Sequence, residues 1–180
     1  MPRIKFVPDD IDHSDELTES VRQRRGGTLL KIDRLMLHSR PIVAGWGALL
    51  GVVNKDISTD ARTRELIVCA VGELTGARYE VAAHGPRFLQ AGGSDAQLAA
   101  LGDVRAAFGD TTLFSDFERA ILRLTFEMTQ NVAVQQSTFE EAYRHLNDEE
   151  RFIEIITIIS SYNMVTRFVV ALDLSPDEGL

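Results

Sequence analysis

Two side chains that can exchange protons lie one helical turn apart in the stretch TGARYEVAAHG, residues 75–85. Glu80 and His84 are four positions apart, so on a helix they share one face. A carboxylate beside an imidazole orients the ring, which makes the histidine a plausible proton donor or acceptor. The same spacing suits a buried polar contact between helices, and spacing alone favours that structural interpretation.

A second carboxylate, Glu65, belongs to the apolar helix predicted before this stretch. Gly76 interrupts the helical pattern, so the segments on its two sides are expected to form an antiparallel hairpin. Glu65 and His84 lie at similar distances from Gly76 along the chain, and a helix rises about 1.5 Å per residue. The two side chains are therefore expected at comparable depth in the hairpin, with Tyr79 next to them.

Further polar side chains interrupt the most apolar segment of the chain. Tyr162 and Asn163 need partners if they are buried, so they either tie helices together or line a substrate pocket. Arg167 is a conceivable anchor for a substrate carboxylate. An arginine near a helix end more often forms a surface or interface pair, so both interpretations stay open.

Other types of site lack their sequence signatures. There is no H-x-x-x-H or E-x-x-H pattern, and the four histidines are scattered. No glycine-rich phosphate loop follows a strand, and no G-x-S-x-G turn occurs. The sequence therefore predicts no metal site and no nucleotide site.

Helical patterns run through almost the whole chain. Capping-box sequences begin at Ser94, Ser115 and Ser137, each followed three residues later by Gln or Glu. Helices are also predicted over residues 15–25, 28–39, 41–54, 60–74, 78–90 and 149–172. Pro86 is expected to kink the fifth of these. With no strand–turn–strand unit, the predicted fold is an all-α bundle in a single domain.

Composition narrows the classes of partner and the compartment. A net charge of −8 over 180 residues weighs against nonspecific binding to nucleic acid or anionic membranes. The basic run RQRRGG, residues 22–27, suits a helix C-terminus better than a phosphate-binding patch. In residues 152–172, Glu154 and Arg167 leave an uncharged run shorter than the roughly 20 residues that span a bilayer. We therefore expect a cytoplasmic protein.

The span RTRELIVCAVGELTGARYEVAAHGPRFLQAG, residues 62–92, resembles the carboxymuconolactone decarboxylase family, which includes the alkylhydroperoxidase D-like proteins. RELI, GARYEVAAH and the closing AG carry the resemblance, and residues 35–50 and 158–172 look like flanking segments of the same group. The resemblance implies an N-terminal extension with a short helix over residues 1–27. The helical domain then covers residues 28–173, and a C-terminal tail covers residues 174–180.

The family's alkylhydroperoxidase D-like members carry a Glu ahead of a Cys-x-x-Cys-x-x-x-His motif. Aligned on His84, the Glu falls at Glu65, and the two cysteines fall at Ala77 and Glu80. Both cysteines are therefore missing, and Cys69, the only cysteine in the chain, belongs to the preceding helix. A dithiol peroxidase mechanism cannot run without a thiolate and a resolving thiol.

The decarboxylase branch does not use the cysteine pair, and it acts on carboxylated lactones from aromatic-compound breakdown without metal or organic cofactor. The resemblance thus implies a cofactor-independent lyase for a small carboxylated lactone or oxo acid. His84 would donate or accept the proton, with Glu80 orienting it and Glu65 setting its protonation. Tyr79 and Tyr162 would donate hydrogen bonds to the developing oxyanion.

Two other functions stay open. The chain could be a non-enzymatic family member with a structural Glu–His cluster, or an antioxidant peroxidase, which the missing cysteines disfavour.

The resemblance also implies an oligomer, because the family assembles as dimers, trimers or hexamers. A homo-oligomer is also expected because the last helix is apolar on nearly every side, at Ile155, Ile158, Ile159, Phe168 and Val169.

Overall fold

The structure, a computed structural model, describes residues 2–8, 10–11 and 15–176. Within those residues every regular element is helical, which confirms the predicted all-α class. The helices are α1 (Glu16–Arg24), α2 (Lys31–Met36), α3 (Arg40–Lys55), α4 (Ala61–Thr75), α5 (Arg78–Gln90), α6 (Asp95–Ala100), α7 (Val104–Ala107), α8 (Asp116–Phe126), α9 (Gln136–Leu146) and α10 (Glu149–Ala171). Two short elements accompany them, η1 (Leu101–Asp103) and the π-helical turn η2 (Glu127–Asn131).

Helices α4 and α5 form the predicted antiparallel hairpin. Asp60 caps α4 by accepting a hydrogen bond from the backbone N–H of Thr63. Gly76 ends the helix with φ of 68°, a left-handed conformation that glycine adopts without a steric cost. A Cβ at Gly72 would lie 2.8 Å from a methyl group of Val81, so this glycine lets the two helices approach closely. The turn and the close approach fix how side chains of α4 face those of α5.

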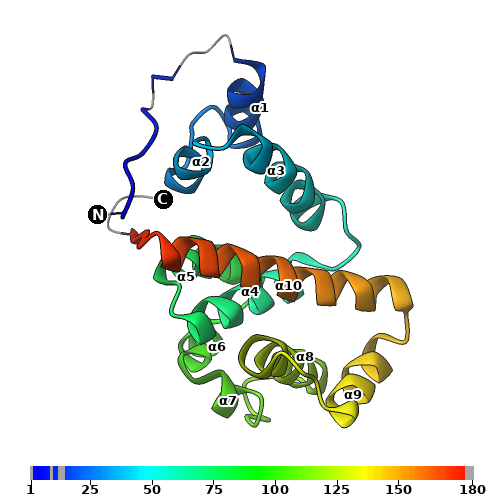
Figure 1. The fold of residues 1–180 in the computed structure, drawn as a ribbon. Coiled ribbons are helices and arrows are strands. Elements are labelled where there is room, and N and C mark those ends of the chain that lie inside the picture. Colours follow the sequence, from blue (N-terminus) through cyan, green and yellow to red (C-terminus); the bar gives the residue numbers. More distant parts are fainter. Residues whose placement is uncertain (1, 9, 12–14, 177–180) are drawn as a thin grey trace.

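The last helix, α10, forms the centre of the molecule. It packs mainly on α4 and also contacts α3 and α9 (Figure 1). By length and composition α10 is apolar enough to cross a membrane, but a core helix meets the same criterion. Its apolar side chains Ile155, Ile158, Ile159 and Val169 are fully buried in the core of this chain, so α10 acts here as a core helix.

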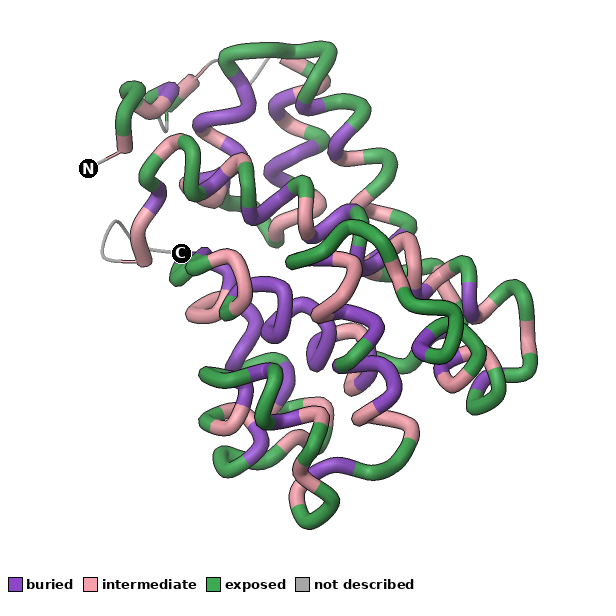
Figure 2. The backbone as a smooth tube through the Cα atoms, turned by 60° about the horizontal axis from the view of Figure 1, so that its bottom comes forward, coloured by how far each residue is buried: buried purple, intermediate pink, exposed green. Residues whose placement is uncertain are grey.

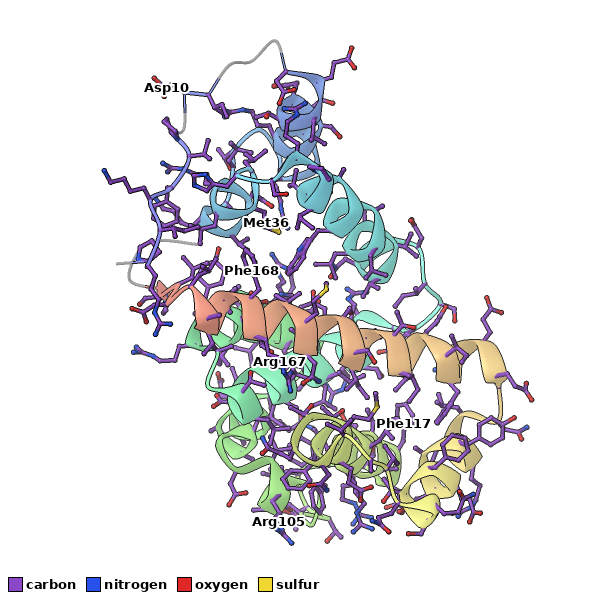
Figure 3. All side chains as sticks on the ribbon, in the orientation of Figure 1. Asp10, Met36, Arg105, Phe117, Arg167 and Phe168 are labelled. Carbon is purple, nitrogen blue, oxygen red and sulfur yellow. The ribbon has the colours of Figure 1, made fainter. Side chains whose placement is uncertain are left out.

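Helices α1, α2 and α3 form a layer on one side of α10 (Figure 1). Trp46 of α3 packs against Phe168 of α10 with ring centroids 5.3 Å apart. Figure 3 shows Phe168 and Met36 in the space between this layer and α10, whereas Arg167 lies on the other side of α10. The N-terminal helices are thus attached to the bundle through apolar contacts.

Buried residues follow the inward sides of the helices (Figure 2). They include four of the five residues on which the expected oligomer rested, and the fifth, Phe168, packs against Trp46. The four buried side chains are therefore not available to contact a neighbouring subunit, whereas Phe168 is partly exposed. The exposed large apolar residues of α3 and α10 are instead Ile42, Leu49, Val52, Ile153, Met164 and Val170.

Two of the three predicted capping boxes are confirmed and one is wrong. Ser94 and Ser115 cap α6 and α8 in the predicted way. Ser137 lies inside α9, whose N-cap is Gln135, and Glu140 instead accepts a hydrogen bond from Gln136 at 2.9 Å. The predicted helix over residues 28–39 is also shorter, because α2 covers only Lys31–Met36. The expected tail and N-terminal extension fall partly outside the described residues, at positions 177–180, 1, 9 and 12–14.

Candidate functional site

A cavity of about 340 Å³ lies between the N-terminal layer and the α4–α5 hairpin. We call its two sides the hairpin wall and the N-terminal wall. The hairpin wall consists of Arg64, Glu65, Tyr79, Glu80, Ala83, His84 and Arg87, and the N-terminal wall of Arg24, Arg25, Leu30, Ile32, Trp46, Gly47, Leu50, Gly51, Asn54 and Lys55. Tyr162 and Val165 of α10 complete the lining.

His84 is held by Glu65 from the neighbouring helix. Its Nδ1 lies 2.6 Å from Oε2 of Glu65, and the two side chains are only 6% and 4% exposed. Because an ionised carboxylate can only accept, Nδ1 carries the hydrogen of this bond. The other ring nitrogen, Nε2, then faces Oε2 of Glu80 at 3.5 Å. The carboxylate that orients the ring through a hydrogen bond is therefore Glu65, whereas Glu80 lies beside the opposite nitrogen.

The environments of the two carboxyl groups push their pKa values in opposite directions. Burial alone would raise the pKa of Glu65, but the hydrogen bond and charge of His84, with the charges of Arg64 and Arg87, hold it below its usual range. Burial raises the pKa of Glu80, and the nearby cations do not offset this. One imidazole thus lies between a carboxylate that releases its proton readily and one that retains it, as in acid–base sites.

The two tyrosines predicted for the site both line the cavity. The ring of Tyr162 meets His84 edge-on, with centroids 5.2 Å apart, and its hydroxyl donates to Oδ1 of Asn54 at 3.0 Å. Burial raises the pKa of Tyr162, and it raises the pKa of Tyr79 to about 12. Both phenols therefore stay protonated at neutral pH. In this structure the hydroxyl proton of Tyr162 points to Asn54.

Asn163 and Arg167 do not line the cavity. The amide of Asn163 donates to Oγ1 of Thr129 at 2.9 Å, which ties α10 to η2. Arg167 is exposed and donates to the backbone carbonyl of Asn163 at 2.9 Å. Of the predicted site residues, the structure therefore brings together Glu65, Tyr79, Glu80, His84 and Tyr162.

Cationic side chains dominate the charge of the cavity lining. The sequence analysis did not predict this basic character. Five basic residues and only two acidic ones border the cavity, although the chain carries a net charge of −8. The run RQRRGG was the available signal. It does end a helix, since α1 stops at Arg24 and Gly26 has φ of 78°. The same turn also directs Arg24 and Arg25 to the cavity.

Thiol chemistry has no group in the cavity to support it. Cys69 is fully buried in the core between α4 and its neighbours, and burial, with Glu65 and Glu73, raises the pKa of its thiol to about 12. The positions that hold cysteines in alkylhydroperoxidase D-like members are Ala77 and Glu80. Across the described residues, no group of three or more His, Cys, Asp or Glu side chains is arranged to hold a metal ion.

Solved structures share this fold over nearly the whole chain. The debrominase Bmp8, solved with 2,3,4-tribromopyrrole, has a TM-score of 0.76 at 19% identity over 96% of this chain and 92% of its own. A peroxidase-related protein from Silicibacter sp. TM1040 has a TM-score of 0.74 at 18% identity, covering 96% and 92%. An alkylhydroperoxidase AhpD core protein from Ralstonia eutropha JMP134 has 0.74 at 19% identity, covering 97% and 92%. At these identities the likeness shows the fold, which is alkylhydroperoxidase D-like.

The sequence profile of the carboxymuconolactone decarboxylase family matches residues 40–123, from the start of α3 into α8. Over this range, a little under half of its length, the chain matches the family. No protein with a curated description matches it in sequence. The matched range contains the whole hairpin wall, whereas α1 and α2 precede it.

Proposed function

We propose that the protein is a cofactor-independent carboxy-lyase that acts on a small carboxylated lactone or oxo acid. The observation that carries this proposal is the row Glu65–His84–Glu80 at the wall of the cavity, with opposite pKa shifts at its two ends. The match of residues 40–123 to the carboxymuconolactone decarboxylase family supports the reaction class.

In the proposed reaction the bond between the substrate carbon and its carboxylate breaks, and carbon dioxide leaves. The electron pair stays on the substrate as an enolate, whose oxygen takes the negative charge. The proton shared by Glu80 and His84 then passes to the substrate carbon, and water reprotonates the pair for the next cycle. Glu65 stays ionised and holds the ring, so that Nε2 remains directed toward Glu80.

The basic lining supports this chemistry by attracting the anionic substrate into a confined site. Electrostatic interactions are stronger there than in water because the surroundings have a lower effective dielectric constant. Arg64, Arg87 and the cations of the N-terminal wall supply this positive potential. A positioned proton donor of this kind contributes about 10²- to 10⁴-fold to the rate.

A non-enzymatic, structural role would explain why Glu65 is buried, but it would not explain why Glu80 is buried. The Glu65–His84 hydrogen bond satisfies both buried groups, as a structural contact does. Glu80 has no such explanation, because no hydrogen bond within the described part of the chain offsets its burial, and its pKa is raised. A buried acid bordering a cavity favours catalysis over a structural role.

We also propose a setting for this activity. The substrate class points to the breakdown of aromatic compounds in the cytoplasm. Self-association is proposed on the basis of the exposed apolar residues of α3, which recur on one side of that helix at Ile42, Leu49 and Val52. Light scattering at micromolar concentration should then give a mass above that of one chain.

The test of the lyase proposal is carbon dioxide release from a panel of carboxylated lactones and oxo acids. A His84→Ala variant should lose turnover by at least about 10²-fold. His145→Ala, the same change at an exposed position of α9, serves as the matched control and should keep full activity. Full activity of His84→Ala on a substrate of the natural protein would contradict the proposal, as would no release from any member of the panel.

A further inference from the structure

Arg24, the last residue of α1, lies across the cavity side of α3. Its guanidinium rests against Gly47, and a Cβ built at that glycine would overlap Nη1 of Arg24. The glycine therefore leaves the space that the guanidinium occupies. Gly45, on the same helix, has no heavy atom near the position of an added Cβ.

Two other cations of the lining, Arg25 and Arg64, have side-chain partners that Arg24 lacks. Arg25 forms two hydrogen bonds with Asp33, at 3.0 and 3.1 Å, and Asp33 is fully buried. Arg64 donates to Glu65 at 3.3 Å. Arg24 has no hydrogen bond or ion pair with any of the residues that the structure describes.

The position of Arg24 disfavours an isolated positive charge. Partial burial, together with the charge of Arg25, lowers its pKa. A guanidinium nevertheless stays charged in proteins, and it binds a carboxylate through two parallel hydrogen bonds. The charge of Asp33 offsets this only in part, and no described residue pairs directly with Arg24, so an anion bound at this point would compensate the remaining charge.

We propose that Arg24, positioned by Gly47, binds the carboxylate of a small ligand in this cavity, so that α1 completes the site. This inference rests on the proposed function only in one respect, namely that the ligand is the substrate of the lyase. Trp46, Leu30 and Leu50 lie in the same wall, so the rest of the ligand should be compact and apolar. The specificity-determining residue would then lie outside the range that matches the family profile.

Trp46 allows binding to be measured without turnover, because it is the only tryptophan and it lines the cavity. The probes are γ-carboxy-γ-butyrolactone and its uncharged primary amide, titrated against tryptophan fluorescence. The natural protein should bind the acid more tightly than the amide. Arg24→Gln should weaken binding of the acid at least tenfold and leave the amide unchanged, as expected for loss of a charge-assisted hydrogen bond.

Two further variants separate the position of the guanidinium from its charge. Gly47→Ala should displace the flexible end of Arg24 while keeping the charge, and it should weaken acid binding in the same way. Gly45→Ala adds the same methyl group to the same helix in open space, and it should bind like the natural protein. Arg144→Gln removes one positive charge from an exposed position of α9, so it controls for net charge.

The outcomes distinguish this inference from the lyase proposal. Binding of acid by Arg24→Gln with unchanged affinity would overturn it, and so would equal affinity of the natural protein for acid and amide. If Arg24→Gln does not fold, Gly47→Ala decides, and unchanged acid binding by that variant overturns the inference. Arg24-dependent binding of the acid without carbon dioxide release would leave the inference standing and count only against the lyase.

Discussion

The two walls of the cavity are built in different ways. The hairpin wall comes from α4, α5 and the single turn between them, and it carries the buried carboxylates and the imidazole. The N-terminal wall comes from α1, α2 and α3, and it contributes cations, an amide and an indole that are less deeply buried. In the proposed function, the hairpin wall moves protons and the N-terminal wall recognises the ligand.

The walls also differ in how their charges are compensated. Glu65 is paired with His84 and Arg64 within the hairpin, so this part of the site is complete without a ligand. Arg24 in the opposite wall has no such partner among the described residues. Two helices joined by one turn thus hold the paired ionisable groups, whereas the cation without a direct partner comes from a separate layer of helices.

The largest effect is expected at Glu80. Glu80→Gln should lower turnover by about 10²- to 10⁴-fold, because the amide cannot transfer a proton. The same variant should be more stable than the natural protein at neutral pH. A raised folded-state pKa means that stability is lost as pH rises from the ordinary carboxyl range through the folded-state value, and glutamine removes that loss.

Thermal melts of both proteins from pH 4 to pH 8, together with turnover, measure this prediction. The two melting temperatures should converge toward the acid end of the range. Lower stability of Glu80→Gln at neutral pH would mean that Glu80 is a structural member of the hairpin.

A smaller loss of activity and the opposite stability effect are expected at Glu65. Glu65→Gln leaves His84 without its carboxylate, which should cost about 1–3 kcal/mol of stability at neutral pH. The pKa of Glu65 is lowered, so its contribution is present above the ordinary carboxyl range and is lost as pH falls through the folded-state value. Denaturant titrations at neutral and acidic pH should show the difference from the natural protein shrinking in acid.

Turnover of Glu65→Gln, measured beside Glu80→Gln, sharpens the contrast within the hairpin wall. Because Glu65 acts through the ring of His84, its variant should retain more activity than Glu80→Gln. Equal losses in both variants would show that the two carboxyl groups act as one unit.

The smallest effect is expected at Arg167. This side chain is exposed and lies outside the cavity, so Arg167→Gln should change stability by less than about 0.5 kcal/mol. Its affinity for a carboxylated probe should equal that of the natural protein. A loss of affinity similar to that of Arg24→Gln would remove the distinction between the N-terminal wall and the rest of the surface.

The hairpin could be predicted from sequence because local signals define it. Gly76 ends α4, and α5 has the predicted bounds. Because Glu65 and His84 lie at similar distances from the turn, the sequence also predicted that their side chains come close together. Helix α5 continues through Pro86, where a kink was expected from the sequence.

The N-terminal wall and the faces of α10 could not be predicted in this way. Arg24 reaches the cavity only because α1 packs near α3, and no local pattern encodes that contact. Helix α10 is apolar almost all round, so its sequence gives no direction for Asn163 or Arg167. At Ser137 the capping pattern was present, but Glu140 is engaged by Gln136 instead.

The burial of Cys69 has a practical consequence for the site. Its sulfur lies inside the protein, and burial raises the pKa of the thiol to about 12, so reagents that alkylate or oxidise thiolates find no target in the cavity. The reaction proposed for Glu80 and His84 draws no electrons from a partner protein. It would therefore continue in air, in dilute peroxide and without added reductant, under conditions that stop a site based on a cysteine pair.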